Sequence, residues 1–128
     1  LMYHNKKIGL LDSQDALVGN KAYDLASLID DVRLKTSNQL KGRVFSYYLK
    51  TNKKIMVKKF QQDFEILSIL RNLKIIGIFT RLALRDKKKK YLKLIPYAWE
   101  MIAHRLQKQN EFKNLMLLLR NNFPKSVR

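Results

Sequence analysis

Three aspartates lie near the start of the chain, and one of them, at the end of a predicted strand, could hold a metal ion. Asp12 directly follows the apolar run at residues 8–11, Asp15 lies a few positions further on, and Asp24 lies at the start of a helical pattern. Mg²⁺ prefers hard oxygen ligands and is usually held by one or two carboxylates together with phosphate groups. Asp12 is therefore a candidate magnesium ligand, although an aspartate at the end of a strand is more often a turn former.

The elements that would position these carboxylates begin with a β-hairpin. Residues 1–3 and 8–11 are short apolar runs, and the polar stretch between them, residues 4–7, has the composition of a turn. Two strands are not stable alone, so this hairpin needs a partner sheet or a helical platform. The residues that follow, up to Asn20, have the composition of a loop.

The remainder of the chain has helical periodicity. Apolar residues recur at positions 25, 28, 29 and 32, on one face of a helix, and Asp24 in its first turn would oppose the helix dipole. Further helices are predicted at residues 39–50, 56–84, 96–108 and 111–121. The pattern predicts a mainly α-helical fold with a short N-terminal β-hairpin. We interpret the chain as one partial domain, with the hairpin and metal loop at residues 1–22 and a helical bundle at residues 23–128.

Local signals within the helical part add detail to this prediction. Gly77 inside the long helix predicts close packing or a kink. The lysine run at residues 87–90 predicts a solvated loop. Pro96 suits the first turn of the next helix, and Pro124 is expected to end the last one.

The charge of the chain has two interpretations. Its 27 lysines and arginines exceed its 10 acidic residues and give a formal net charge of +17. One interpretation is a polyanionic partner, such as nucleic acid, an anionic membrane surface or a phosphorylated ligand. The other is a compositional preference for lysine without function. We favour the second, because the lysines are scattered, whereas nucleic-acid modules usually cluster arginine and aromatic residues on one face.

Composition excludes several classes of protein. A length of 128 residues is sufficient for one domain, and a hydrophobic share of 46% is enough for a core. The absence of cysteine excludes disulfide scaffolds and thiolate metal sites. No apolar run reaches eighteen residues and no signal peptide precedes the first strand, so we expect a cytoplasmic protein without a membrane partner.

Three blocks of sequence resemble one known family. Residues 8–17 read Ile-Gly-Leu-Leu-Asp-Ser-Gln-Asp-Ala-Leu, and residues 23–28 read Tyr-Asp-Leu-Ala-Ser-Leu. Residues 71–83 and the stretch from Tyr91 to Trp99 form the second and third blocks. Together they resemble the aminoglycoside-phosphotransferase-like superfamily, which has a protein-kinase-like fold. Within it they look most like bacterial cell-wall sugar kinases that phosphorylate N-acetylmuramate and N-acetylglucosamine at the anomeric position.

The resemblance implies a role for each candidate residue. Asp12 matches the Mg²⁺-binding aspartate. Asp24 matches a buried aspartate that braces the catalytic loop, and Asp15 would support the same loop or the metal site. Arg71 and Trp99 are candidates for the substrate side, although an ordinary salt bridge and an ordinary core aromatic are the favoured interpretations. The chain would then be the C-terminal lobe of the kinase fold.

The chain also departs from the family pattern. Ser13 stands where the family usually has phenylalanine, which packs behind the metal aspartate. The family's catalytic loop, His-x-Asp-x-x-x-x-Asn, would end immediately before Leu1, so the catalytic base, the Gly-rich loop and the ATP-binding lysine are expected outside this chain. We expect a fragment of an ATP-dependent enzyme that is inactive alone, binds neither Mg²⁺ nor ATP tightly by itself, and partners with the missing N-terminal half and a sugar substrate. Its uncovered apolar surface favours self-association.

Two alternatives to a kinase fragment stay open. The first is a basic helical binding module for nucleic acid or another polyanion, which would show a steep salt dependence of binding. The second is a helical interaction domain that kept the fold and lost the chemistry. Asp12 and Asp24, within their matching motifs, favour the kinase fragment.

Overall fold

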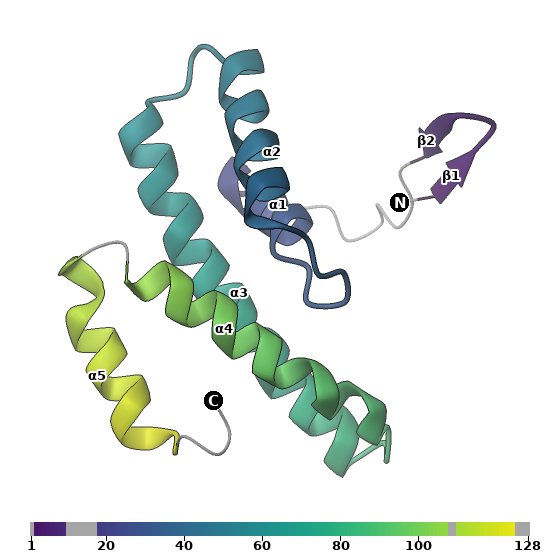
Figure 1. Cartoon of the computed structure of the whole chain (residues 1–128), viewed down its shortest axis with the longest axis vertical. Coiled ribbons are helices and arrows are strands. Elements are labelled where there is room, and N and C mark those ends of the chain that lie inside the picture. The colour runs from purple at the N-terminus through teal and green to yellow at the C-terminus, as the bar shows by residue number, and fades with distance from the viewer. Residues whose placement is uncertain (1, 10–17, 108–109, 125–128) are drawn as a thin grey trace.

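The computed structural model describes residues 2–9, 18–107 and 110–124. A β-hairpin is followed by helices, which confirms the predicted mainly α-helical chain with a short N-terminal hairpin (Figure 1). In chain order the elements are β1 (Met2–His4), β2 (Lys7–Gly9), α1 (Lys21–Ile29), α2 (Asn38–Thr51), α3 (Val57–Leu84), the 3₁₀-helix η1 (Lys89–Leu94), α4 (Ile95–Leu106), the 3₁₀-helix η2 (Asn110–Phe112) and α5 (Lys113–Asn122).

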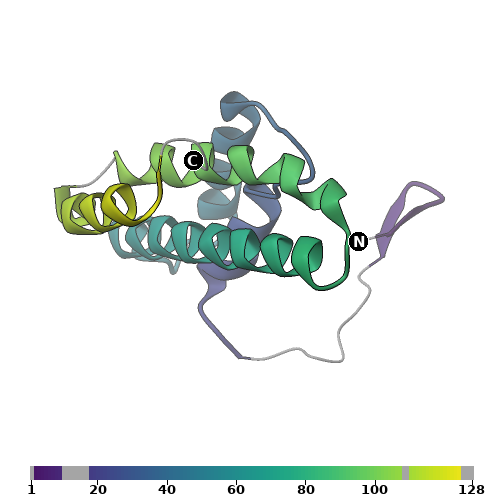
Figure 2. The same cartoon turned by 90° about the horizontal axis from the view of Figure 1, so that it is seen from below.

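The hairpin stands apart from the helices (Figures 1 and 2). Its strands pair antiparallel with Tyr3 opposite Ile8, and the turn residues Asn5 and Lys6 have φ values of 48° and 59°. Two successive left-handed residues match the twist of a tight hairpin. Tyr3 and Ile8 are 72% and 69% exposed, so the hairpin has no apolar platform among the described residues that would cover these side chains.

Helix α1 begins two residues earlier than the pattern predicts. The side chain of Asn20 caps it by accepting a hydrogen bond of 2.9 Å from the backbone N–H of Ala22. Its buried face consists of Ala22, Leu25, Ala26 and Ile29. The prediction that Leu28 lies on this face is wrong, because α3 covers the face that carries the alanines and leaves Leu28 56% exposed.

Helices α2 and α3 confirm the predicted positions almost to the residue. Ser37 caps α2 by accepting a hydrogen bond from the backbone N–H of Leu40. Aromatic side chains join α2 to α3: the ring of Phe45 lies 4.9 Å from that of Phe64, and Tyr48 stacks on Phe60 at 5.4 Å. With the buried face of α1, these rings form the first hydrophobic core.

Gly77 does not mark a close approach. The helix α3 is continuous through it, and a Cβ atom built there would meet nothing within 4 Å. The expectation of close packing is wrong because position 77 lies on the exposed side of the helix. The lysines at residues 87–90 are exposed, as predicted, but the last two belong to η1 and not to a loop.

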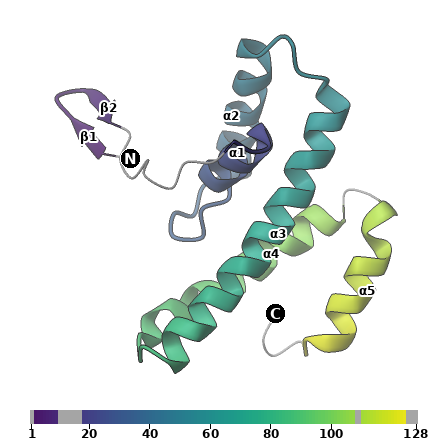
Figure 3. The same ribbon diagram turned by 180° about the vertical axis from the view of Figure 1, so that it is seen from behind.

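Helix α4 lies alongside α3 and forms the other two cores (Figures 1 and 3). Pro96 lies in its first turn, as predicted. One core joins α3, α4 and α5, and contains Ile69, Trp99, Ile102, Leu106, Phe112 and Leu119. The other contains Val32, Phe79, Ala98 and Met101. Within the described ranges, no helix has the length and apolar character needed to cross a membrane.

Candidate functional site

Of the three aspartates that the sequence indicates as candidates, the structure describes only Asp24. Asp12 and Asp15, with Ser13, lie outside the described residues, so their predicted roles stay predictions. Asp24 lies in the first turn of α1, as expected, and its side chain is exposed. Its predicted role in bracing a catalytic loop is not tested by this position. Elsewhere in the described part, no three His, Cys, Asp or Glu side chains gather where they could hold a metal ion.

Arg71 lies on α3 and reaches the end of α1. Its Nη1 donates a hydrogen bond of 3.0 Å to the backbone carbonyl of Asp30, the C-cap residue of α1. Burial lowers the pKa of the Arg71 guanidinium, and the nearby Asp31 carboxylate opposes that change. Arg71 therefore satisfies a carbonyl at a helix C-terminus, which is a common structural role for arginine. Its substrate role stays a prediction.

Trp99 is part of the hydrophobic core. It is 6% exposed, and its ring lies 5.1 Å from that of Phe123 at the end of α5. It also lines a groove of about 920 Å³ between α4 and α5. These contacts agree with the favoured interpretation of an ordinary core aromatic, and the structure does not bring Trp99 together with Arg71.

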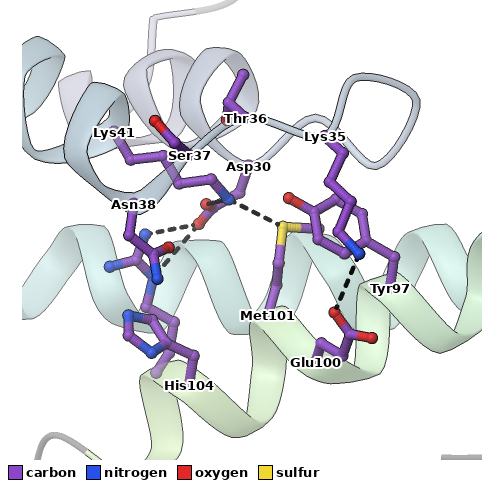
Figure 4. A pocket seen from close by; sticks show the side chains of 11 residues that line it. Asp30, Lys35, Thr36, Ser37, Asn38, Lys41, Tyr97, Glu100, Met101 and His104 are labelled. Atoms are coloured by element: carbon purple, nitrogen blue, oxygen red, sulfur yellow. Dashed lines mark hydrogen bonds and ion pairs between the residues drawn. The ribbon is translucent and has the colours of Figure 1, made fainter.

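The most concentrated polar chemistry in the described chain surrounds Asp30. This carboxylate is 1% exposed and accepts hydrogen bonds from three other helices. Figure 4 shows the bond from Lys41. Ser68 Oγ of α3 donates at 2.6 Å, Arg105 Nη2 of α4 donates at 2.9 Å, and Lys41 Nζ of α2 donates at 3.0 Å. We name these four residues the Asp30 cluster. It ties α1, α2, α3 and α4 together at one buried point.

Electrostatics keep Asp30 ionised. Burial raises the pKa of its carboxyl, but the charge of Arg105 and the hydrogen bonds from Ser68 and Lys41 outweigh burial and hold the pKa below its usual value. The Arg105 guanidinium also lies 4.7 Å from the ring centroid of Phe64, where a cation is attracted to the face of the ring. Asp30 is therefore a charged structural group and not a proton donor at neutral pH.

A polar pocket opens above this cluster. It measures about 310 Å³ and lies between the start of α2 and the side of α4 (Figure 4). Its lining residues are Asp30, Lys35, Thr36, Ser37, Asn38, Lys41, Tyr97, Glu100, Met101, His104 and Arg105. We name it the Asp30 pocket. A neighbouring cavity of about 450 Å³ shares Asn38, Lys41, His104 and Arg105 with it.

Sequence reasoning missed the Asp30 cluster, although one of its members, Arg105, has a signal in the sequence. Arg105 follows Ala98, Met101 and Ile102 at helical spacing, so it lies within the apolar face of α4. A charged side chain within an apolar face is almost never fully buried unless it is paired. That rule predicts an acidic partner for Arg105, but it does not identify Asp30.

The fold and the pocket define a small, mainly helical unit in which four helices meet at the buried carboxylate of Asp30. No protein-family model matches the chain. Over 93 residues, 73% of its length, the chain is 33% identical to the N-acetylmuramate/N-acetylglucosamine kinase of Caulobacter vibrioides. It is 36% identical over 102 residues to the protein of that name from Neisseria meningitidis, and 30% identical over 125 residues to that from Pseudomonas aeruginosa.

These similarities support the kinase family that the sequence motifs indicate. They reach across 73% to 93% of this chain but only 26% to 37% of the relatives. The chain thus spans between about a quarter and somewhat more than a third of the curated relatives that it matches.

Proposed function

We propose that this chain is part of an ATP-dependent phosphotransferase that acts on a cell-wall amino sugar. One observation carries the proposal: the chain is 30–36% identical, over 73–93% of its length, to kinases named for N-acetylmuramate and N-acetylglucosamine. The acceptor would be the anomeric hydroxyl of such a sugar. The chain would form the C-terminal lobe of the enzyme, as one partial domain, and would act in the cytoplasm, where ATP is available.

In this proposal Asp12 is the ligand for Mg²⁺. The donor chemistry fits this ion, because carboxylate oxygens are hard ligands and Asp15 lies close by in the sequence. The described residues offer no rival cluster of metal ligands. When bound, Mg²⁺ would neutralise charge on the transferring phosphate. Asp12 would hold the ion, while Asp15 and Asp24 would support the loop around it.

The helical part would form the substrate side of the enzyme. The Asp30 cluster supports this role, because it fixes four helices relative to one another through a single buried carboxylate. A rigid platform holds reacting groups in a productive geometry. Arg71 and Trp99 lie on α3 and α4 of this platform, and we propose that their main contribution is to hold it together.

A chimeric enzyme tests this proposal. This chain replaces the matched segment of the Neisseria meningitidis kinase, and ATP-dependent phosphorylation of N-acetylmuramate and N-acetylglucosamine is measured. We expect activity with at least one sugar. Asp12→Asn should reduce kcat by about 100-fold or more, because phosphoryl transfer depends on charge neutralisation by the metal.

Asp86→Asn is the matched control for this experiment. It removes one carboxylate from a partly exposed site, where Asp86 pairs with the exposed neighbour Arg85. The control should keep the activity of the chimera. A folded chimera that phosphorylates neither sugar, or an Asp12→Asn variant as active as the Asp86→Asn variant, would contradict the proposal.

A basic binding module remains the second candidate, and one specific observation favours it. Exposed lysines gather at both ends of α3: Lys53, Lys54, Lys58 and Lys59 near its start, and Lys87, Lys88, Lys89 and Lys90 after its end. Charge of this density attracts polyanions at low salt. Because each group contains four lysines, the contributions of the two groups to polyanion binding can be compared directly.

A further inference from the structure

The turn between α2 and α3 exposes two apolar side chains among lysines. Met56 and Val57 lie at the start of α3 and are 75% and 54% exposed. Two exposed lysines precede this pair and two follow it: Lys53, Lys54, Lys58 and Lys59. We name residues 53–59 the α2–α3 tip. It lies at one end of the molecule, away from α4 and α5 (Figures 1 and 3).

The tip belongs to a longer stretch without acidic residues. Residues 32–62 contain nine lysines and arginines and no aspartate or glutamate. The next acidic residues on α3 are Asp63, which accepts a hydrogen bond of 2.8 Å from Asn20, and Glu65, which is 2% exposed. With both of these carboxylates counted in full, the four lysines still leave a net charge of about +2 at the tip. An anionic surface is therefore attracted to this end of the molecule.

The side chains of the tip do not stabilise the helix that they begin. Met56 is the N-cap residue of α3, and its side chain makes no capping hydrogen bond. Small polar residues are preferred at this position because their side chains do make that bond. Lys58 and Lys59 lie in a first turn that contains no acidic residue, where a positive charge opposes the helix dipole. Residues that break local rules of stability in this way are typical of sites with another function.

An anionic lipid surface suits both kinds of side chain at the tip. Lysines near such a surface are attracted to the charged headgroups, and apolar side chains are stabilised at the boundary between headgroups and acyl chains. Nucleic acid suits the tip less well, because its recognition usually combines lysine with arginine and aromatic groups, and residues 53–59 contain neither. A second copy of the chain would bring like charges together.

The exposed side of α2 leads to the tip and has a similar character. Within α2 no residue is fully buried. Leu40 and Tyr47 are seven positions apart, so they lie on the same side of the helix, and they are 46% and 69% exposed. Together with Arg43 they line a shallow groove of about 690 Å³. Apolar and basic side chains on one exposed side are typical of a helix at a membrane surface, where tyrosine is enriched.

We propose that the α2–α3 tip docks on an anionic phospholipid surface. Met56 and Val57 insert at the headgroup boundary, and the four lysines pair with headgroup phosphates. Two apolar side chains give only weak insertion, so binding is reversible and needs the lysines as well. The expectation of a protein without a membrane partner rests on the lack of a spanning segment and a signal peptide, and peripheral binding needs neither. The proposal does not depend on the proposed kinase function.

Co-sedimentation of the whole chain with lipid vesicles tests the proposal at pH 7 and constant ionic strength. One set of vesicles is phosphatidylcholine alone, and the other contains about 30% of the anionic lipid phosphatidylglycerol. We expect binding to the anionic vesicles to be at least about tenfold tighter. Replacing the four tip lysines by glutamine should remove most of this difference.

The double variant Met56→Ser/Val57→Ser separates insertion from attraction by charge. It removes apolar area and leaves every charge in place, so it should weaken binding to anionic vesicles by about fivefold or more. Serine is a preferred N-cap residue, so the variant should unfold in urea at no lower concentration than the wild type. It should also bind a labelled RNA as tightly as the wild type does.

The matched control is Leu84→Ser/Leu92→Ser. It removes two apolar side chains, 71% and 41% exposed, beside the other lysine group at residues 87–90. This variant should keep the affinity of the wild type for anionic vesicles. If both double variants weaken binding equally, the contact is not made by the tip and the proposal is wrong.

A fluorescent label locates the contact directly. The chain contains no cysteine, so a single introduced cysteine can be labelled. A polarity-sensitive fluorophore on Val57→Cys should shift its emission to shorter wavelength on anionic vesicles, whereas the same label on Leu84→Cys should not. The absence of a shift at position 57 would contradict insertion of the tip.

Two further results would overturn the proposal. The first is equal affinity of the chain for neutral and anionic vesicles. The second is wild-type affinity for anionic vesicles in a folded Met56→Ser/Val57→Ser variant, because attraction by charge alone would then explain the binding, as in the polyanion-binding module. None of these measurements involves ATP or phosphoryl transfer, so each outcome is distinct from failure of the kinase proposal.

Discussion

The guanidinium of Arg105 lies 2.9 Å from the carboxylate of Asp30, and 75 residues of sequence separate the two. This pair closes α4 onto the end of α1, and α3 and α2 join it through Ser68 and Lys41. Helices α1, α2, α3 and α4 therefore share one polar junction in addition to their hydrophobic cores. Bonds to a buried charge at such a junction fix the positions of the helices relative to one another. The loss of one partner leaves a buried charge unpaired and lowers the stability of the fold.

Asp30→Asn should destabilise the chain strongly. Two cations that are nearly buried would lose their ion pairs with Asp30, and breaking a buried pair in this way typically costs about 3–5 kcal/mol. Urea unfolding followed by far-ultraviolet circular dichroism at pH 7 measures the change in the free energy of unfolding. Asp31→Asn is the control, because Asp31 pairs with the exposed Arg33 and should contribute less than about 1 kcal/mol. Equal effects of the two substitutions would contradict a special role for Asp30.

The contribution of Asp30 to the free energy of unfolding should disappear in acid. Its pKa in the folded chain lies below the ordinary value of 3.8, so the folded state binds the proton less readily than the unfolded state does. Such a group stabilises the fold above its unfolded pKa and loses that contribution as the pH falls through the folded pKa. The difference in unfolding free energy between the wild type and Asp30→Asn should be constant from pH 5 to 7 and shrink below about pH 4. A difference that persists unchanged to pH 3 would show that charge is not its source.

The positions of the helices could be predicted from the sequence because helical periodicity is local. Residues three and four positions apart share a face, so the pattern predicts α2 at residues 39–50, and the structure has it at Asn38–Thr51. The Asp30 cluster could not be predicted in this way. Its three donors lie 11, 38 and 75 residues from Asp30, and no local pattern indicates which segments meet.

The errors of prediction have the same physical origin. Leu28 and Gly77 both lie on helices that are predicted correctly, yet each lies on a side that no other described helix covers. Periodicity shows that a helix has an apolar face, but packing decides which part of that face is buried. In α1 the alanines at positions 22 and 26 are fully buried against α3, which moves the buried face away from Leu28.

The hairpin should promote self-association of the isolated chain. Tyr3 and Ile8 are exposed on a two-stranded sheet whose edges can pair with another chain. The double variant Tyr3→Ser/Ile8→Ser should shift the chain towards monomer in analytical ultracentrifugation. Tyr47→Ser/Leu84→Ser removes side chains of equal exposure, 69% and 71%, from α2 and α3 and should have a smaller effect. A wild-type chain that sediments as a compact monomer would contradict this prediction.

The purified chain should not phosphorylate N-acetylmuramate or N-acetylglucosamine with ATP and Mg²⁺. Phosphoryl transfer needs a positioned nucleophile, a nucleotide site and several charges around the phosphate. Asp12 alone supplies one of these charges. A radiolabelled-ATP assay with the Neisseria meningitidis kinase as a positive control measures the rate. Sustained phosphorylation that the Asp12→Asn variant lacks would mean that the chain is a complete catalyst.

The two lysine groups at the ends of α3 should contribute equally to polyanion binding. If the positive charge reflects only a compositional preference for lysine, each lysine adds a similar, nonspecific attraction to a polyanion. Replacing either group of four lysines by glutamine should then weaken heparin or RNA binding to the same degree. The slope of log affinity against log salt should also fall by a similar amount in both variants. A dedicated binding module would behave differently, because one group would dominate both the affinity and the slope. Fluorescence anisotropy with a labelled RNA between 50 and 200 mM salt therefore separates a scattered charge from a localised nucleic-acid surface.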